Sequence, residues 1–248
     1  MDTDLEQLKP GERLDDLQRS GLKIIQNPEK FCFGMDAVLL SGFAGIKKGE
    51  VAVDIGTGTG IIPLLLSAKT YARHFTGIEI QEYMADMARR SVLLNKLENR
   101  ISIINKDIKQ TLEEIPSGSI DVVTSNPPYI EDRHGLQNID SAVAIARHEI
   151  KCSLDDVLKE AARMLRNGGR LYMVYRPHRF AELIYKMKEN LLEPKRVRFV
   201  HPFTDKEANM VLVEACKNGG RWLKAESPLI VYENIGKYTE EIINTYGY

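Results

Sequence analysis

Val51-Ala-Val-Asp-Ile-Gly-Thr-Gly-Thr-Gly60 is an apolar run that ends in three alternating glycines and leads into the apolar stretch Ile61–Lys69. This order is typical of a buried β-strand that turns sharply into a helix. Glycines at such a turn let the backbone bend and let a ligand contact the main chain. The segment therefore predicts an α/β fold with a binding site at the strand-to-helix turn.

Short apolar runs alternate with helical patterns along the rest of the chain, which favours a doubly wound α/β fold with a mostly parallel, seven-stranded sheet. The expected strands are Val51–Ile55, His74–Ile80, Ile101–Asn105, Ile120–Thr124, Arg170–Tyr175, Arg196–His201 and Met210–Cys216. The last two are too close in sequence for a helical crossover, so we expect the final strand to be antiparallel. The expected helices are Ala37–Phe43, Ile61–Lys69, Glu82–Asn95, Leu154–Leu165 and Arg179–Asn190.

The boundaries of two helices carry recognisable signals. Asp36 and Ser153 can cap the helices that follow them, and Asn167-Gly168-Gly169 is expected to end the second of these helices. No linker rich in Gly, Ser or Pro divides the 248 residues. We therefore expect one domain over residues 46–248 and an N-terminal extension, residues 1–45, that packs on its core.

The composition is that of an ordinary globular protein, with 43% hydrophobic and 28% charged residues. No apolar run approaches the roughly 18 residues needed to span a membrane. The N-terminal sequence is acidic and polar, unlike a secretory signal. The cysteines Cys32, Cys152 and Cys216 are far apart, which argues against a zinc site and a disulfide framework. We expect a cytoplasmic protein without a bound metal.

Charge is unevenly distributed along the chain. Residues Lys159–Lys224 hold 15 Lys and Arg against 7 Asp and Glu, although the whole chain has a net charge of −1. Such a split indicates a polyanionic partner for the later part of the chain. An ordinary solvated basic face is the alternative.

The glycine loop does not have the spacing of a dinucleotide site, because Ile61 stands where the third glycine of that motif belongs. A P-loop would need Gly-Lys-Ser/Thr here, and the sequence has none. Instead Asp54 precedes Gly56, Gly58 and Gly60, and its carboxylate suits a ligand with an ammonium group, such as the α-amino group of methionine. A tight turn without a ligand is the alternative.

Two further acidic residues stand where the next two strands end. Glu79 is suited to accept hydrogen bonds from the two hydroxyls of a ribose, and Asp107 from an adenine amino group. Ile80 and Ile108 supply apolar surfaces for the ring. Because ligands of open α/β sheets lie beyond the carboxyl ends of the strands, we expect these acids to converge with Asp54.

The fourth strand ends in Asn126-Pro127-Pro128-Tyr129. The two prolines stiffen the backbone and remove N–H donors, which leaves carbonyl acceptors in a rigid loop. The amide oxygen of Asn126 and the carbonyl of Pro127 can hold both hydrogens of an exocyclic NH₂, so that its lone pair points at an electrophile. Tyr129 offers a face on which a base can stack. A simple β-turn is the alternative.

Together these motifs resemble those of the class I S-adenosylmethionine-dependent methyltransferases of the amino-methylating branch. More narrowly, the chain resembles bacterial valine-tRNA adenine N6-methyltransferases, which modify the adenine beside the anticodon. The resemblance covers nearly the whole chain and is also carried by Gln26, Phe31–Leu40, Ala146–Glu149, Gly168-Gly169, Arg198–Pro202 and Pro228–Val231. It implies a Rossmann-like methyltransferase fold and S-adenosylmethionine as cofactor. It also implies that Phe33 and Met35 lie near the methionine end of the cofactor and the target base, although Met35 equally suits the core.

The resemblance thus implies N6-methylation of an adenine in tRNA, with catalytic roles for Asn126, Pro127 and Tyr129. The expected cofactor contacts are Phe33, Asp54, Gly56, Gly58, Gly60, Glu79, Ile80, Asp107, Ile108 and Asn126. Methylation of adenine or guanine in rRNA is an open alternative. A protein glutamine N5-methyltransferase is disfavoured, because those enzymes usually carry a separate helical domain that about 45 residues cannot form. A non-catalytic RNA-binding module would not need Asn126 and Tyr129.

The substrate is expected to be an unpaired or flipped-out base, held by phosphate contacts elsewhere on the protein. We expect these contacts on the basic later strands, from Arg176, His178, Arg179, Lys195, Arg196, Arg198, His201 and Lys206. The polar loop Ile130–Ala146 is expected to close over the substrate, followed by Arg147, His148 and Glu149. The sequence leaves the oligomeric state open.

Overall fold

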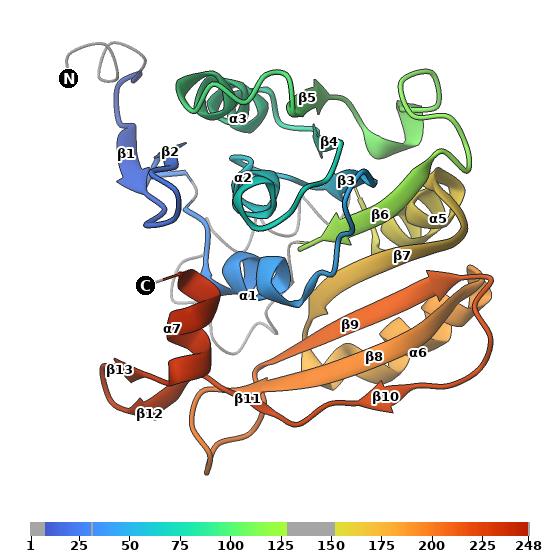
Figure 1. The fold of residues 1–248 in the computed structure, drawn as a ribbon. Helices are drawn as coiled ribbons and strands as arrows, with labels where there is room; N and C mark the ends of the chain where they lie inside the picture. The colour runs from blue at the N-terminus through green and yellow to red at the C-terminus, as the bar shows by residue number, and fades with distance from the viewer. Residues whose placement is uncertain (1–7, 31, 128–151, 248) are drawn as a thin grey trace.

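The computed structural model describes residues 8–30, 32–127 and 152–247. Its centre is a large sheet in the order β10-β8-β9-β7-β6-β3-β4-β5, with β11 also paired to β8 (Figure 1). Its long strands are β3 (Val51–Ile55), β4 (His74–Glu79), β5 (Ile101–Asn105), β6 (Ile120–Ser125), β7 (Leu165–Tyr175), β8 (Leu192–His201) and β9 (Met210–Lys217). Strands β3 to β7 are parallel, whereas β9 runs antiparallel between β7 and β8. The short strands β10 (Lys224–Ala225) and β11 (Leu229–Ile230) extend the sheet beside β8.

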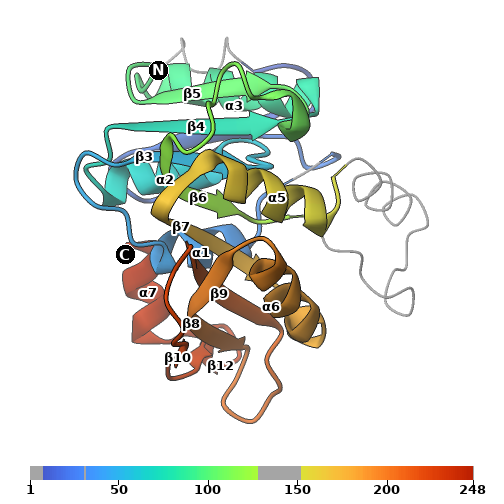
Figure 2. The ribbon, with the colours of Figure 1, turned by 90° about the vertical axis from the view of Figure 1, so that its right-hand side faces the viewer.

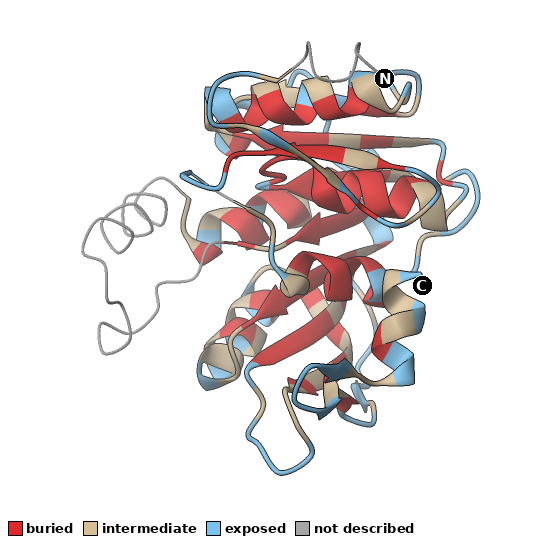
Figure 3. Cartoon of the chain, turned by 90° about the vertical axis from the view of Figure 1, so that its left-hand side faces the viewer, coloured by how far each residue is buried: buried red, intermediate tan, exposed pale blue. Residues whose placement is uncertain are grey.

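Helices cover both faces of the sheet (Figure 2). One face packs on α1 (Met35–Phe43) and α2 (Ile61–Lys69), with α3 (Glu82–Leu94) beside them; the other packs on α5 (Leu154–Met164) and α6 (Phe180–Glu189). Successive side chains of each strand point to opposite faces of the sheet, so the core has two parts. For example, Val122 packs on the first face and its neighbour Val123 on the second. Buried residues accordingly line both sides of the sheet (Figure 3).

The seven predicted strands and their antiparallel end are confirmed, and the two short edge strands are additional. Two predicted strand starts are wrong. Strand β7 already begins at Leu165, directly after α5 ends at Met164, and β8 begins at Leu192 and not at Arg196. Gly168 adopts φ +76°, and a Cβ at Gly169 would lie 2.9 Å from the carbonyl oxygen of Arg166. These glycines therefore shape an irregular start of a strand, where Leu165 pairs with Ile120.

The predicted cap at Asp36 is also wrong. Gly34 is the N-cap of α1, and Asp36 lies in the first turn without capping through its side chain. A carboxylate in the first turn still interacts favourably with the positive end of the helix dipole. Ser153 does cap α5, in a reciprocal capping box with Asp156.

Several short elements were not predicted, most of them near the two ends of the chain. They are the hairpin β1 (Arg13–Asp16) and β2 (Lys23–Gln26), the hairpin β12 (Tyr232–Asn234) and β13 (Lys237–Tyr238), the helix α7 (Glu240–Tyr246), and the 3-10 turns η2 (Ile108–Gln110) and η3 (Pro177–Arg179). Elements of two to seven residues carry too little periodicity to be recognised. Their stability comes from packing, as for Ile24 and Ile25 of β2, which are fully buried.

The two end regions of the chain contact each other. Arg19, in the turn between β1 and β2, donates to the carbonyl oxygens of Asn244 and Tyr246 at the end of α7 (3.4 and 3.3 Å). Helix α7 lies beside α1 (Figure 1), and Ile242 joins the same core as α1 and α2. Among the described residues, no helix has the length and apolarity required to cross a membrane.

Gly77 in β4 allows the glycine loop to lie close to the sheet. A Cβ at this position would lie 2.8 Å from Cγ2 of Thr57 and 2.9 Å from Cδ1 of Ile103. We predict that Gly77→Ala lowers the free energy of unfolding by about 1–3 kcal/mol, because the β-branched Thr57 must shift.

Urea denaturation of the purified variant measures this change. Gly220→Ala is the matched control, since a Cβ there meets nothing within 4 Å, and its stability should stay within about 0.5 kcal/mol of the wild type. Equal losses in the two variants would contradict the assignment of Gly77 to loop packing.

Candidate active site at the carboxyl edge of the sheet

The glycine loop is tied to the end of β4 by its own backbone. The N–H groups of Gly56 and Thr57 both donate to the carbonyl oxygen of Ile78 (2.9 and 3.0 Å). Gly56, Gly58 and Gly60 all adopt positive φ, at +72°, +58° and +86°. Because other residues rarely adopt this conformation, the three glycines are required for the shape of the loop.

Glu79 lies directly against this loop, at the end of β4. Its Oε2 accepts from the N–H of Gly58 (3.0 Å) and its Oε1 from the N–H of Gln81 (2.9 Å). Its exposed fraction is only 6%. Each carboxylate oxygen can accept a further hydrogen bond, so Glu79 is held in one orientation and can still receive hydroxyl donors.

Asp54 is the most unusual group of the site, because it is 3% exposed and only one of its two carboxylate oxygens accepts a hydrogen bond within the described residues. Its Oδ1 accepts from the hydroxyl of Thr124 on β6 (2.6 Å). Burial raises the pKa of Asp54 to about 7, opposed by the Thr124 and Thr57 hydroxyls and increased by the charge of Glu79. The Thr57 hydroxyl is close enough to stabilise the ionised form of Asp54. Even so, Asp54 Oδ2 forms no hydrogen bond of ordinary geometry within the described residues.

The hydroxyls of Thr57 and Thr59 are likewise buried and without a hydrogen-bond partner among the residues that the structure describes. Buried polar groups normally find partners, so a cluster of unsatisfied oxygens indicates a site for a polar ligand. The carboxylate of Asp54 is suited to a cationic group in particular. The residues present therefore fit a ligand with an ammonium group.

Asp107 stands at the end of β5, next to β4 in the sheet. It caps η2 by accepting from the N–H of Lys109 (2.9 Å), and its side chain is 23% exposed. Ile108 is buried and Ile80 is half-buried. These residues follow neighbouring strand ends, as expected, and the Nδ2 of Asn105 links the strands by donating to the carbonyl oxygen of Glu79 (2.8 Å).

Asn126 and Pro127 follow β6, on the other side of β3. Ser125 pairs with Ile55 in register and donates to its carbonyl oxygen (3.1 Å). Asn126 is half-buried and Pro127 is buried. The end of β6 is thus fixed beside the end of β3, which carries Asp54 and the glycine loop. Tyr129, the loop Ile130–Ala146 and the segment Arg147–Glu149 lie outside the described residues.

Phe33, expected near the cofactor, lies between β2 and α1 in the N-terminal part of the chain. Its N–H donates to Oε1 of Gln26 (2.8 Å), and Gln26 is 2% exposed. The Nε2 of Gln26 donates in turn to Oδ2 of Asp15 in β1. Phe33 and Met35 are half-buried and pack against the core of α1 and α2. The hairpin therefore holds the backbone at Phe33 through one buried amide.

Sequence reasoning did not identify Asp15, Thr57, Thr59 or Thr124 as parts of the site. Thr124 gave one signal, since it is a hydroxyl residue that follows the apolar pair Val122-Val123 near the end of β6. The contribution of Asp15 gave none, because Gln26 reaches it only through the folded hairpin.

The predicted phosphate-binding surface needs a correction at two positions. Arg196 bonds Glu214, Glu226 (3.1 Å) and the carbonyl oxygen of Phe43 (3.0 Å), and its guanidinium lies 4.3 Å from the ring of Phe43. Arg198 makes a bidentate pair with Glu241 (2.5 and 2.8 Å). These arginines are neutralised within the fold and hold β8 to its neighbours.

The other cations proposed for that surface are engaged to different degrees. Arg179 bonds Glu182 (2.9 Å), and Arg176 donates to the carbonyl oxygen of Asn209 (3.2 Å). Lys206 lies 3.4 Å from Asp205, and Lys195 donates to the carbonyl oxygen of Gly220 (2.8 Å). Among the residues that the structure describes, Lys195 therefore has no acidic partner.

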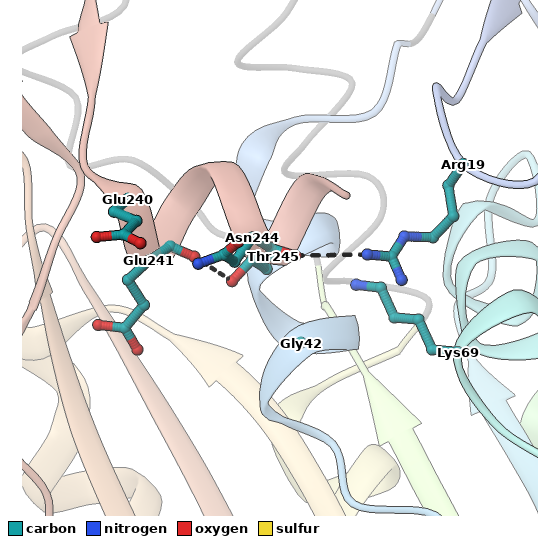
Figure 4. Close-up of a pocket in the computed structure, with 7 residues that line it drawn as sticks. All are labelled: Arg19, Gly42, Lys69, Glu240, Glu241, Asn244 and Thr245. Atoms are coloured by element: carbon teal, nitrogen blue, oxygen red, sulfur yellow. Dashed lines mark hydrogen bonds between the residues drawn. The ribbon is translucent and has the colours of Figure 1, made fainter. Parts of the chain in front are cut away.

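An open cleft of about 510 Å³ lies elsewhere, between α7 and the end of α2 that is remote from the glycine loop (Figure 4). Arg19 and Lys69 face Glu240, Glu241, Asn244 and Thr245 across it. Lys69 donates to the hydroxyl of Ser41 (2.8 Å), and burial lowers its pKa to about 8. This cleft shares no residue with the candidate active site.

The raised pKa of Asp54 predicts how stability depends on pH. The folded protein holds the Asp54 proton up to about pH 7, whereas the unfolded chain releases it near pH 4. The free energy of unfolding should therefore fall as pH rises between these values and then level off. An asparagine at this position has no proton to lose. We therefore predict that the free energy of unfolding of ligand-free Asp54→Asn is about 1–3 kcal/mol higher than that of the wild type at pH 8, and that the difference is much smaller at pH 5.

Urea denaturation at several pH values measures the difference. Asp205→Asn, at an exposed side chain, controls for the chemical substitution itself. If the wild type and Asp54→Asn show parallel pH profiles, Asp54 does not carry an energetic cost when it ionises.

Comparison with known proteins places the chain in a family. The family model described as methyltransferase small domain matches residues 33–198. The tRNA1(Val) (adenine(37)-N6)-methyltransferase of Parabacteroides distasonis is 30% identical over 183 residues, covering 73% of this chain and 75% of the relative. Its counterpart in Porphyromonas gingivalis is 29% identical over 225 residues, covering 85% of each chain.

Solved structures agree with the fold. A protein of Agrobacterium tumefaciens described as a predicted O-methyltransferase superposes with a TM-score of 0.69 at 24% identity, covering 86% of this chain and 95% of that one. Geranyl diphosphate C-methyltransferase of Streptomyces coelicolor, crystallised with S-adenosyl-L-homocysteine, superposes with a TM-score of 0.56 at 16% identity, covering 74% and 78%. With the family model matching most of its length, this chain belongs to the methyltransferase small domain family.

Proposed function

We propose that this chain transfers a methyl group from S-adenosylmethionine to N6 of an adenine in tRNA. The observation that carries the proposal is that Asp54 lies in β3 and Asn126 directly follows the adjacent strand β6. Thr124, two residues before Asn126, donates directly to Asp54. A buried, half-satisfied carboxylate for the cofactor therefore lies beside a rigid acceptor segment for an amino group.

The chain's own residues would hold the cofactor at four points. Asp54 would accept from the ammonium of its methionine part, and Glu79 from its ribose hydroxyls. Asp107 would accept from the adenine amino group, while Ile80 and Ile108 supply apolar contacts. When bound, S-adenosylmethionine supplies an electrophilic methyl group; the protein supplies orientation and excludes water.

Asn126 and Pro127 would position the amino group of the substrate. The side-chain carbonyl of Asn126 and the main-chain carbonyl of Pro127 each accept one N–H, which directs the nitrogen lone pair away from the base ring. Because these acceptors matter most as the nitrogen becomes tetrahedral, they contribute to turnover more than to binding. Tyr129, outside the described residues, is proposed to stack on the base.

The curated relatives support tRNA as the substrate, since they are named for the adenine at position 37 of tRNA1(Val). Such a substrate implies a cytoplasmic reaction. We further propose residues 46–248 as the catalytic domain and residues 1–45 as an extension that packs on it. Leu17, Leu22 and Ile24 support this packing, because they lie in one apolar cluster with residues of β3 and α2.

Methyl transfer to an unmodified tRNA1(Val) transcript tests the proposed function. We predict methylation that is lost when the adenine at position 37 is replaced by guanine. Asn126→Ala should reduce single-turnover methylation by about 100-fold, in the range seen when one preorganised polar contact to a reacting group is removed. Its affinity for S-adenosylhomocysteine should change little.

Asn234→Ala, at an exposed position of β12, is the matched control and should retain full activity. Methylation of rRNA or of a protein glutamine, with none of tRNA, would reject the tRNA assignment. Wild-type rates for Asn126→Ala would reject the mechanism.

The buried amide of Gln26 generates a separate prediction about cofactor binding. Gln26→Glu, assayed at pH 8, keeps an acceptor for Phe33 but turns a second carboxylate oxygen toward Asp15. We predict about tenfold weaker binding of S-adenosylhomocysteine, equivalent to one lost hydrogen bond.

Adding Asp15→Asn should restore affinity to within about threefold, because the asparagine amide can donate to Glu at position 26. Asp15→Asn alone should be nearly neutral, since the amide can turn its oxygen toward Gln26. Calorimetry measures the affinities. Failure of the double variant to recover would show that Gln26 acts only through general stability.

A further inference from the structure

The loop that joins β9 to β10 displays the only tryptophan of the chain. Trp222 is 79% exposed, and Leu223 beside it is 44% exposed. Leu191, which is 63% exposed, touches the same loop, because its carbonyl oxygen accepts from the N–H of Asn218 (2.8 Å). Tryptophan is largely buried in most proteins. An indole left in solvent with apolar neighbours therefore indicates a contact surface.

The backbone around Trp222 is held in an unfavourable conformation. Trp222 has φ +141°, and Asn218 has φ +54°. Positive φ is disfavoured for residues with a side chain and persists only where surrounding contacts impose it. Here Lys195 donates to the carbonyl oxygen of Gly220 (2.8 Å), and Asn218 donates from its side chain to Asn167 (2.7 Å). The loop thus presents its indole from a fixed framework.

Positive charge surrounds the indole. Arg221 and Lys224 are exposed on either side of it, and within the described part of the chain Arg221 has no ion pair. Lys195 contacts a neutral carbonyl and keeps its charge. Glu226, the acid nearest to Trp222 in the sequence, lies 3.1 Å from Arg196 and 4.0 Å from Lys224, so it is shared between two cations.

We propose that residues 217–224, the tryptophan loop, form a second RNA-binding site for the tRNA substrate. Trp222 stacks on an unpaired base or on the open end of a base stack, and Arg221, Lys224 and Lys195 contact phosphates. Aromatic side chains among Lys and Arg are the usual means of binding nucleic acid without reading its sequence. This inference rests on the proposed tRNA substrate.

The tryptophan loop lies far from the candidate active site. Strand β9 is antiparallel to β7, so its last residue, Lys217, lies at the sheet edge opposite the carboxyl ends of β3, β4 and β6. Strand β8, with 10 residues, runs from that end of the sheet to the end that carries the candidate active site. Its length separates the two ends by about 30 Å. Trp222 therefore cannot stack on the target adenine and binds a part of the tRNA outside the loop being methylated.

Because of this separation, only an RNA of sufficient length can contact the tryptophan loop and the candidate active site at the same time. A distance of about 30 Å corresponds to roughly nine stacked nucleotides at about 3.4 Å each. A hairpin of the anticodon stem and loop alone is too short to occupy both sites. Full-length tRNA should use the tryptophan loop, and the short hairpin should not.

Intrinsic tryptophan fluorescence reports on the loop directly, because Trp222 is the only tryptophan. We expect full-length unmodified tRNA1(Val) to quench this fluorescence and the short hairpin to leave it unchanged. Trp222→Ala should raise the Kd for full-length tRNA about tenfold, within the range for loss of one base stack, and Trp222→Phe should retain part of the affinity. Affinity for the short hairpin and for S-adenosylhomocysteine should not change.

Two further variants complete the test. Arg221→Gln with Lys224→Gln should make the salt dependence of tRNA binding shallower, by about 0.7–0.9 in log–log slope per lost phosphate contact. Tyr71→Ala, at a residue 82% exposed elsewhere, is the matched control and should leave tRNA binding unchanged. Unchanged melting temperatures establish that all variants are folded.

The outcomes separate this inference from the proposed function. If the wild type methylates tRNA but Trp222→Ala binds it with wild-type affinity, the tryptophan loop is not an RNA site, and the proposed function stands. If the short hairpin quenched the Trp222 fluorescence as strongly as full-length tRNA does, Trp222 would not contact a part of the tRNA remote from the target adenine. If neither the short hairpin nor the full tRNA accepts a methyl group, the proposed function itself fails, and the inference fails with it.

Discussion

The rest of the site depends on three hydrogen bonds that backbone N–H groups of the glycine loop donate to the end of β4. Gly56 and Thr57 donate to the main chain at Ile78, and Gly58 donates to the carboxylate of Glu79. The turn after β3 is therefore fixed by the next strand rather than by its own sequence alone. Because β6 lies on the other side of β3, the acidic and amide-bearing strand ends form one continuous edge. The parallel order of β4, β3 and β6 thus determines which side chains can act on the same ligand.

Asp54 shows how this arrangement favours function over stability. A carboxylate that is 3% exposed and has one unsatisfied oxygen is unfavourable in the ligand-free protein. The hydroxyl of Thr124 offsets part of that cost, and the charge of Glu79 increases it. A cationic ligand would remove the unfavourable term, so part of its binding energy is already stored in the fold. Unsatisfied buried groups of this kind are expected at functional sites more than elsewhere.

The sequence was most informative where a local pattern and the final environment agree. Strands such as β3 and β5 were predicted with their observed bounds, because their apolar runs are short and end at glycine or polar residues. The acids of the candidate site could be selected because each lies at or near the carboxyl end of a strand. The structural roles of Arg196 and Arg198 could not, since their partners Glu214, Glu226 and Glu241 are 18 to 43 residues away. Charge counts register a basic segment but do not reveal which cations the fold neutralises. The start of β7 was missed because Gly168 and Gly169, normal helix terminators, instead belong to the strand.

The contact between Arg19 and the end of α7 has a consequence for how the chain is made. In the sequence, Arg19 is 225 residues from Asn244 and 227 residues from Tyr246. During translation, Arg19 in the turn between β1 and β2 is synthesised 225 residues before Asn244 of α7. The hairpin, with its apolar residues Ile24 and Ile25, can therefore contact this helix only after the intervening polypeptide has been made. Closure between distant segments is a slow step in folding, so the packing around Arg19 is a late event.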